Sequence, residues 1–255
     1  EQLAVVGGLS AGIAHEIKNP LGSMKGLVQL MIEDAHTGTI SNEYLFRISK
    51  DIERIDKVVN NVLSFSQARD LEINPVYIND ILRMAQNNCE TQYTEKKIKV
   101  LFNLSSSLPD YHADGEKLYS AFYNIIKNAY DLMEPMNTLT LETKRVPVQP
   151  FVTKYSFFLN NQDGIEFKRD DGILIIISNT GTQIEDVNID RVFNPFFTSK
   201  TTGTGLGLAI CKQIIDAHCG KIDVLSEKNR VSFRIMLPVF KMKGISHEAQ
   251  NSDHR

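Results

Sequence analysis

The sequence lacks four features that would narrow its class at once. No uninterrupted apolar run approaches the roughly 20 residues that a membrane-spanning helix needs, and no signal peptide is visible at its start. The chain has only three cysteines, an odd number that argues against a disulfide framework. Its 28 Lys and Arg residues are balanced by 31 Asp and Glu residues, so a net charge of −3 gives no electrostatic reason to expect nucleic acid as a partner.

These absences set the first expectations. We expect reduced thiols in a cytoplasmic protein, with no nucleic-acid partner and no membrane contact within this chain. The chain does not begin with Met and opens within a helical pattern, so we expect the soluble portion of a longer protein, in which a membrane segment can lie upstream. Its 255 residues, 42% of them hydrophobic, are enough for one large domain or two smaller ones.

Residues 1–71 carry the pattern of two amphipathic helices. Between Leu45 and Val62 the apolar residues alternate at spacings of three and four, which is a heptad seam. His36–Thr39 is typical of a turn, and Ser41 of the N-cap of the second helix. Because two helices cannot enclose such a seam, we expect a second hairpin to complete a four-helix bundle, and therefore a homodimer.

Residues 72–240 mix helix and strand patterns without strict alternation, which favours an α+β sandwich. We expect Glu72–Pro75 to be an extended linker, Asp114 to cap a helix, and residues 241–255 to be a disordered tail. A helix is expected from Thr204 to a stop at Gly220. Further helices are expected over 79–94 and 114–133, and strands over 97–104, 138–144, 173–178, 221–225 and 231–237.

The first candidate for chemistry is His15. An isolated helical histidine is usually only exposed to solvent, but its neighbours favour a nucleophile. Glu16 can accept one imidazole N–H, which leaves the other ring nitrogen with a lone pair. Asn19 follows four residues later on the same face, where its amide can position a water. Pro20 removes the donor that would bond the Glu16 carbonyl, so we expect a bend beside the histidine.

Two further segments point to phosphate and metal. Asn124 and Asn128 lie one helical turn apart and can offer amide oxygens to Mg²⁺, although two surface amides are an equally good interpretation of that segment alone. Phe193–Lys200 precedes the glycine-rich run Gly203–Leu208. Glycines let backbone N–H groups approach an anion, the following helix adds its N-terminal dipole, and Lys200 adds a point charge. The run matches neither the Walker A nor the dinucleotide-binding pattern.

In combination, these segments make the chain resemble a sensor histidine kinase of two-component signalling, from about Leu3 to Pro238. AHEIKNPL, which contains His15, resembles the phospho-acceptor H box. NIIKNA resembles the N box, FNPFFTSK the F box, and GTGLGL the G2 box of the GHKL ATPase superfamily. Each is modest alone, but four in this order and spacing are highly specific. The resemblance implies a dimeric four-helix bundle built from the hairpin at 1–71, followed at 72–240 by an ATP-binding α+β sandwich of the Bergerat (GHKL) type.

The resemblance also implies roles for single residues. His15 is the phospho-acceptor, Glu16 its general base, and Asn19 orients water for a reverse reaction. Asn128, together with Asn124, holds Mg²⁺ against the phosphates of ATP. The other implied nucleotide contacts are Asp131, Asn179, Gly181, Phe197, Lys200, Thr204, Gly205, Leu206, Gly207 and Leu208.

The sequence departs from the family pattern in two places. Where the family usually has Asp-x-Gly-x-Gly, Asn179–Gln183 reads Asn-Thr-Gly-Thr-Gln. The Asn179 amide oxygen can still accept from the adenine amino group, more weakly than a carboxylate, but its NH₂ then needs a separate acceptor. Gln183 replaces a glycine, so we expect a stiffer lid hinge and weakened but surviving ATP binding. The segment Arg145–Asp171 is also long, and we interpret it as an extension of a hairpin, with partner binding and mere decoration both open.

The sequence therefore predicts ATP-dependent autophosphorylation of His15 and phosphoryl transfer to a response-regulator aspartate, with phosphatase activity toward that regulator. Two alternatives stay open. The altered G1 box can mark a catalytically weak nucleotide-sensing or scaffolding module. A GHKL ATPase of another kind fits the C-terminal half but has no need of an exposed His-Glu pair. His36, His112 and His218 lack companions at ligand spacing, and we interpret them as structural.

Overall fold

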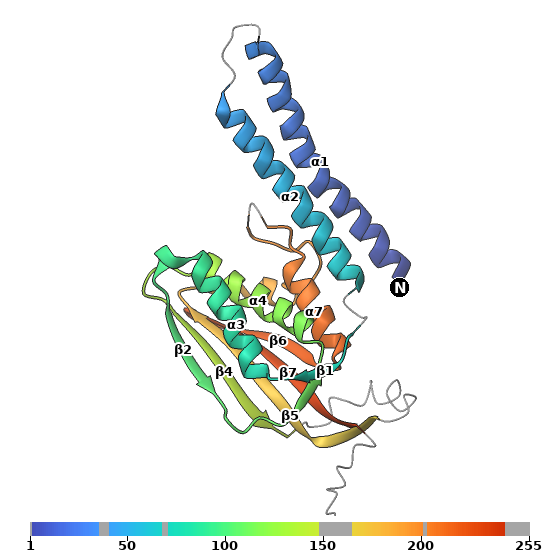
Figure 1. The fold of residues 1–255 in the computed structure, drawn as a ribbon, viewed down its shortest axis with the longest axis vertical. Coiled ribbons are helices and arrows are strands. Elements are labelled where there is room, and N and C mark those ends of the chain that lie inside the picture. The colour runs from blue at the N-terminus through green and yellow to red at the C-terminus, as the bar shows by residue number, and fades with distance from the viewer. Residues whose placement is uncertain (1, 36–40, 68–70, 148–164, 201–202, 243–255) are drawn as a thin grey trace, which may run out of the picture. The chain divides into compact units, whose positions relative to one another are not determined.

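The structure is a computed structural model that describes residues 2–35, 41–67, 71–147, 165–200 and 203–242 (Figure 1). The chain divides into two compact units. One contains residues 1–70 together with 186–213, and the other contains residues 71–185 together with 214–255.

The N-terminal part is a helical hairpin, as predicted. Helix α1 (Gln2–Ala35) continues through Pro20 and packs against α2 (Asn42–Gln67). Ser41 accepts a hydrogen bond at its Oγ from the Glu43 N–H at 3.2 Å, which confirms it as the N-cap of α2. The predicted turn His36–Thr39 lies outside the described residues.

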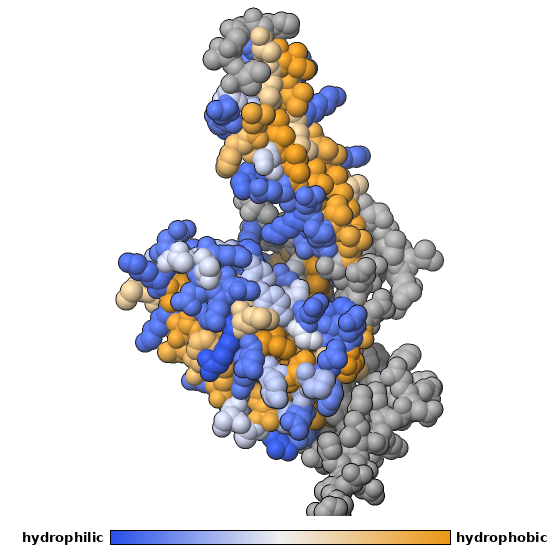
Figure 2. All heavy atoms as spheres, in the orientation of Figure 1, coloured by the Kyte–Doolittle hydropathy of each residue, from blue (hydrophilic) through white to orange (hydrophobic). Residues whose placement is uncertain are grey.

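The heptad seam of α2 divides into two sets of side chains. Val58 is fully buried, while Ile48, Ile55 and Val62 are half-buried. The alternate seam positions Leu45, Ile52 and Val59 are 51%, 49% and 42% exposed. Apolar side chains are also exposed elsewhere on the two helices, as Figure 2 shows along the hairpin, at Leu21, Val28, Leu30, Ile32, Phe46 and Leu63. One hairpin therefore covers only part of its own apolar surface.

The second unit is built on a five-stranded mixed sheet. The strand order is β2 (Lys99–Leu104), β4 (Thr138–Val146), β5 (Ile165–Thr180), β7 (Arg230–Met242) and β6 (Lys221–Glu227). Strands β2 and β4 are parallel, and the other pairs are antiparallel. Helices α3 (Ile78–Gln92) and α4 (Gly115–Leu132) cover one face (Figure 1). This is the predicted α+β sandwich of the GHKL type.

The core lies between the sheet and these two helices. On the central strand β5, Ile173, Ile175 and Ile177 are at most 1% exposed, while Leu174 and Ile176 on the opposite face are half-buried. On α4, Ile125 and Ile126 are fully buried. The nearly continuous apolar run of β5 thus has a simple cause, because both faces of this strand are at least partly covered.

The predicted linker Glu72–Pro75 is extended, but it is bound to the second unit. Strand β1 (Asn74–Val76) pairs antiparallel with β3 (Tyr111–Ala113). The Glu72 N–H also donates to Asp114 Oδ2 at 3.1 Å. Asp114 accepts from the Lys117 N–H at 3.0 Å and is the predicted N-cap of α4. Burial raises the pKa of its carboxyl, but these hydrogen bonds outweigh burial and hold that pKa below its ordinary value.

The last helix differs at both ends from the prediction. Helix α7 (Gly207–Ala217) begins three residues after Thr204. At its end the left-handed residue is Cys219, with φ 56°, rather than Gly220. The Cys219 N–H donates to the Asp216 carbonyl, and the Gly220 N–H to the Ile215 carbonyl, which is a Schellman motif shifted by one residue. Glycine is still required at 220, because a Cβ there would lie 2.7 Å from the Met236 carbonyl oxygen.

The sequence predicted that the long segment before β5 extends the hairpin of β4 and β5. Its described residues instead extend the pairing of β5 with β7. Strand β4 ends its pairing at Val146 opposite Gly172, whereas β5 reaches back to Ile165 and pairs with Met242 at the end of β7. A bulge separates the pairs at Phe167 and Gly172. Residues 148–164 lie outside the described residues, as do 243–255 of the predicted tail, whose first two residues belong to β7.

Two smaller expectations concern membranes and thiols. Among the described helices, none is long and apolar enough to cross a bilayer. None of the three cysteines forms a disulfide, and burial raises the pKa of the Cys89 and Cys211 thiols to about 12, so both stay protonated.

His218 is structural, and its hydrogen bonds predict a pH-dependent stability. It is buried, its Nε2 accepts from the Asp114 N–H at 3.1 Å, and its Nδ1 lies 2.7 Å from the Ile214 carbonyl oxygen. The ring is therefore neutral when folded, and burial lowers its pKa below 6.5. As pH falls, His218 is protonated in the unfolded chain before it is protonated in the folded protein. The stability that the neutral ring contributes is therefore complete above pH 6.5 and is lost as pH falls toward the folded pKa.

Urea unfolding at several pH values should show wild type losing stability relative to His218→Gln on acidification. Parallel curves would contradict this assignment.

Candidate functional site

His15 is exposed on α1, as a phospho-acceptor must be. Asn19 Nδ2 lies 3.2 Å from the ring nitrogen Nδ1, one helical turn away. The amide NH₂ can only donate, so Nδ1 accepts and the neutral ring carries its proton on Nε2, which has no partner among the described residues. The exposed Nε2 can act as a nucleophile once a base takes that proton.

Glu16 does not make the contact that the sequence predicted. Its Oε2 lies 3.5 Å from Nη2 of Arg54 on α2, and the two side chains are 22% and 33% exposed. The reason is helical geometry, because consecutive residues point about 100° apart and do not face each other. His15 therefore points to solvent while Glu16 points toward α2, and Asn19 takes the place beside the ring.

The candidate metal ligand and its neighbour lie on α4. Asn124 and Asn128 are both half-buried, on the edge opposite the fully buried Ile125 and Ile126. An amide oxygen at this edge fits Mg²⁺, which usually keeps several waters and takes few protein ligands when it also binds phosphates. Among the described residues, no cluster of three or more His, Cys, Asp or Glu side chains offers a closed metal site.

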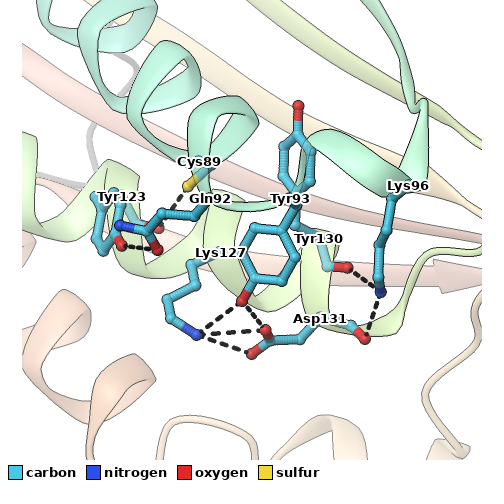
Figure 3. A network of polar contacts seen from close by, with 8 residues as sticks. All are labelled: Cys89, Gln92, Tyr93, Lys96, Tyr123, Lys127, Tyr130 and Asp131. Carbon is cyan, nitrogen blue, oxygen red and sulfur yellow. Dashed lines mark hydrogen bonds and ion pairs between the residues drawn. The ribbon is translucent and has the colours of Figure 1, made fainter.

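Asp131, the third predicted residue of this helix, belongs to a polar network at the end of α4 (Figure 3). Its carboxylate accepts from the Tyr93 hydroxyl and lies 3.3 Å from Lys127 Nζ. Burial raises the pKa of Tyr93, and the hydrogen bond to Asp131 raises it further, so the phenol remains the donor. Lys96 caps the helix by donating to the carbonyl oxygens of Tyr130, Asp131 and Met133. The described contacts of Asp131 fasten α4 to the turn after α3, and its role in nucleotide binding stays a prediction.

Asn179 is the residue that the family resemblance places at the adenine-binding aspartate. It is 4% exposed at the end of β5. Its Nδ2 donates to Thr182 Oγ1 at 2.6 Å and more weakly to the Thr180 carbonyl at 3.4 Å. The separate acceptor that the amide NH₂ needs is therefore present, and the amide oxygen is left to accept from a ligand.

The turn after β5 depends on Gly181. Its φ is +85°, and a Cβ there would lie 1.9 Å from Asn137 Oδ1. Its N–H donates to the Asn229 carbonyl at 3.2 Å. Glycine is needed here because no other residue can take this conformation so close to Asn137.

The predicted phosphate-binding segment lies in the other unit. Phe197 stacks with the Arg191 guanidinium at 5.0 Å. The Lys200 N–H donates to Thr198 Oγ1 at 3.0 Å. Gly205 has φ +65°, and a Cβ there would lie 2.4 Å from the Phe196 backbone, so the chain approaches itself too closely for any side chain. Thr204 and Leu206 are buried, and Gly207 and Leu208 open helix α7.

The predicted residues are thus distributed over both units. His15, Glu16, Asn19 and the segment from Phe197 to Leu208 fall in the first, and Asn124, Asn128, Asp131, Asn179 and Gly181 in the second. Sequence reasoning missed Thr182 and Lys127. The four-residue spacing from Lys127 to Asp131 was a usable signal for an ion pair on a helix. Nothing in the sequence alone indicated that the Thr182 hydroxyl accepts a hydrogen bond from Asn179.

A helical hairpin with an exposed histidine, followed by an α+β sandwich with these polar residues, defines the class of two-domain phosphotransfer kinases. The family described as "Histidine kinase-, DNA gyrase B-, and HSP90-like ATPase" matches residues 113–241. The "His Kinase A (phospho-acceptor) domain" matches residues 6–71. The chain belongs to this ATPase family, and its two domains make it a sensor histidine kinase of two-component signalling.

Individual relatives agree with this assignment. The chain is 31% identical to sensor histidine kinase ZraS of Salmonella typhi over 240 residues, which cover 94% of this chain and 47% of that protein. It is 30% identical to sensory histidine kinase/phosphatase NtrB of Rhodobacter capsulatus over 232 residues, 91% of this chain and 62% of the relative. The chain spans about half the length of the ZraS proteins it matches.

The fold is shared with histidine kinase ThkA, solved in complex with response regulator protein TrrA. The TM-score is 0.69 at 23% identity, over 94% of this chain and 63% of that one.

Proposed function

We propose that this chain transfers the γ-phosphoryl group of ATP to His15. The observation that carries the proposal is the exposed imidazole of His15, held at Nδ1 by Asn19 on the helix of a phospho-acceptor domain. An ATPase domain of the GHKL type in the same chain supplies the phosphoryl donor.

In the ATPase domain, each residue contributes to binding and orientation. The amide oxygen of Asn179 accepts from the adenine amino group. Asn128, with Asn124 beside it, offers an amide oxygen for Mg²⁺, whose charge, when bound, neutralises the phosphates. Gly205 lets backbone N–H groups approach the phosphates, and Lys200 adds a positive charge.

At the histidine, the attack requires a lone pair on Nε2. The Asn19 NH₂ can only donate, so Nδ1 accepts and the neutral ring carries its proton on Nε2. Before or as Nε2 attacks, this proton goes to Glu16 as general base, which frees the lone pair on Nε2. Glu16 must leave Arg54 to reach the ring. Their contact of 3.5 Å is too long for a strong hydrogen bond, so its loss costs little. The phosphorus is then attacked in line, and ADP leaves as the N–P bond forms.

We further propose that phosphohistidine passes its phosphoryl group to an aspartate of a response regulator. ThkA, which shares the fold, was solved with a response regulator, and NtrB is named as both kinase and phosphatase. By the same likeness, Asn19 orients the water that hydrolyses the regulator's acyl phosphate.

Asn19→Ala should separate these two activities. We expect release of phosphate from a phosphorylated regulator to fall about 100-fold, because the water loses its positioning amide. Autophosphorylation should fall less, since Nε2 remains exposed. Stopped reactions with a labelled regulator measure both, and equal losses would argue against this role for Asn19.

We propose that the hairpin dimerises through the exposed half of its heptad seam. Ile52→Glu should weaken the dimer about 10- to 100-fold, because it removes apolar burial and places like charges near each other across a two-fold axis. Asn60→Glu adds the same charge at another exposed position of α2 and serves as the control. Sedimentation equilibrium measures both variants, and an unchanged dimer with Ile52→Glu would rule out this face.

The alternative of a scaffold that does not use nucleotide is tested by calorimetry with a non-hydrolysable ATP analogue and Mg²⁺. The proposal expects binding below millimolar concentration, because the Asn179 NH₂ is satisfied by Thr182. No binding at millimolar ligand would favour the scaffold.

A further inference from the structure

Asn179 differs from an aspartate in having two chemically opposite ends. Its Oδ1 can only accept hydrogen bonds and its Nδ2 can only donate them. An aspartate in this place would accept with either oxygen. An asparagine discriminates between purine bases only if something fixes which end faces the ligand.

Two acceptors fix that end inside the protein. Thr182 Oγ1 lies 2.6 Å from Asn179 Nδ2, and the Thr180 carbonyl oxygen lies 3.4 Å from it. A hydroxyl can also donate, but a backbone carbonyl cannot. Both acceptors therefore favour the NH₂ on the side of the amide that faces Thr180 and Thr182. The carbonyl oxygen is then on the opposite, outward side, where the proposed function places the base.

The backbone holds both acceptors in place. Thr180 accepts at Oγ1 from the Thr138 N–H at 2.9 Å, and Gly181 is bonded to Asn229. Beyond Thr182, Ile184 is bonded through both its N–H and its carbonyl to Ser226 Oγ, at 2.8 and 3.0 Å. Thr182 thus sits in a turn that is fastened on both sides, so its hydroxyl is presented to Asn179 without a large entropy cost.

We infer that Thr182 is a positioning residue that orients the Asn179 amide and thereby gives this site its selectivity for a 6-aminopurine over a 6-oxopurine. The inference rests on the proposed nucleotide-binding role of Asn179. With Nδ2 engaged by Thr182, the outward oxygen accepts from the amino group of adenine. The same oxygen would meet the carbonyl of a 6-oxopurine, and two acceptors repel.

The hydrogen bond to Thr182 sets the free-energy cost of a rotation of the Asn179 amide that exchanges the positions of Oδ1 and Nδ2. Without it, only the weak contact to Thr180 opposes a flip that would turn Nδ2 outward, toward a 6-oxo group. Removing the Thr182 hydroxyl should therefore weaken ATP binding and spare or improve binding of inosine triphosphate. A purely structural role would weaken both nucleotides alike.

The test is calorimetry of the full chain with Mg²⁺ and either ATP or inosine triphosphate. We expect wild type to prefer ATP at least tenfold, and Thr182→Val to reduce that preference about tenfold, the value of one hydrogen bond. Thr182→Ser keeps the hydroxyl and should keep the preference. Thermal unfolding of each variant reports whether the turn remains folded.

A second experiment makes Thr182→Val in a protein that already carries Asn179→Asp. In an Asn179→Asp background, both oxygens of the carboxylate are acceptors, so an acceptor faces the base whichever way the group turns. Adding Thr182→Val to this background should therefore leave the preference for ATP unchanged. An undiminished preference in Thr182→Val alone, with ATP still bound, would overturn the inference and leave the proposed function intact. If wild type bound neither nucleotide at millimolar concentration, the proposed function would fail, and the inference with it.

Discussion

His15→Ala is expected to lose all labelling from γ-labelled ATP in the presence of Mg²⁺. The imidazole is the proposed nucleophile, and alanine has no atom that can form the N–P bond. Nucleotide binding should persist, because the residues proposed to hold ATP lie elsewhere in the chain. Gel autoradiography under neutral conditions measures the label, and calorimetry measures the binding.

A second histidine variant serves as the control. His112 lies half-buried on β3 and has no part in the proposed reaction, so His112→Ala should label at the wild-type rate. Acid-labile label that persisted in His15→Ala would refute the assignment. Steady ATP hydrolysis that is indifferent to His15→Ala, without phosphoprotein, would instead favour a GHKL ATPase of another kind.

Asn128→Ala should lower the initial rate of autophosphorylation about 100-fold or more at saturating ATP. The variant removes the amide oxygen proposed to hold Mg²⁺, and with it the charge that the metal places on the phosphates. The helix should remain folded, since Asn128 is half-buried and alanine is the best helix former.

Asn87→Ala is a matched control for this change. It removes the same amide from an exposed position on α3, and we expect no effect on the rate. Titration with Mg²⁺ separates the possible causes, because a lost metal ligand raises the Mg²⁺ concentration that half-saturates the rate. A wild-type rate and Mg²⁺ dependence in Asn128→Ala would remove this residue from the site.

Much of the fold could be predicted because local patterns and tertiary packing agree. The heptad seam of α2, the N-caps Ser41 and Asp114, and the apolar run of β5 each indicated the element that forms. The family resemblance then joined these elements, since four short segments in one order are more specific than any of them alone. The two family matches confirm it.

The errors share a physical cause, which is that side-chain partners depend on three-dimensional direction rather than on nearness in sequence. Glu16 follows His15 directly, yet it points toward α2, and Asn19 one turn away contacts the ring. Glu72–Pro75 has the composition of a linker, but β3 is available to pair with it.

Ends of elements were also misplaced, for a local reason. Gly220 follows α7 and suggested the left-handed position, but the helix closes one residue earlier on Cys219. The hydroxyl of Thr182 could be matched to the amide of Asn179 only when the turn at Gly181 was known.

Mass-spectrometric mapping of the phosphoryl group, under conditions that preserve phosphohistidine, shows which residue accepts it from ATP. After incubation with ATP and Mg²⁺, we expect one modified peptide, the segment that contains His15, with the phosphoryl group on its imidazole. Consumption of ATP with the phosphoryl group on another residue, or on none, would contradict it.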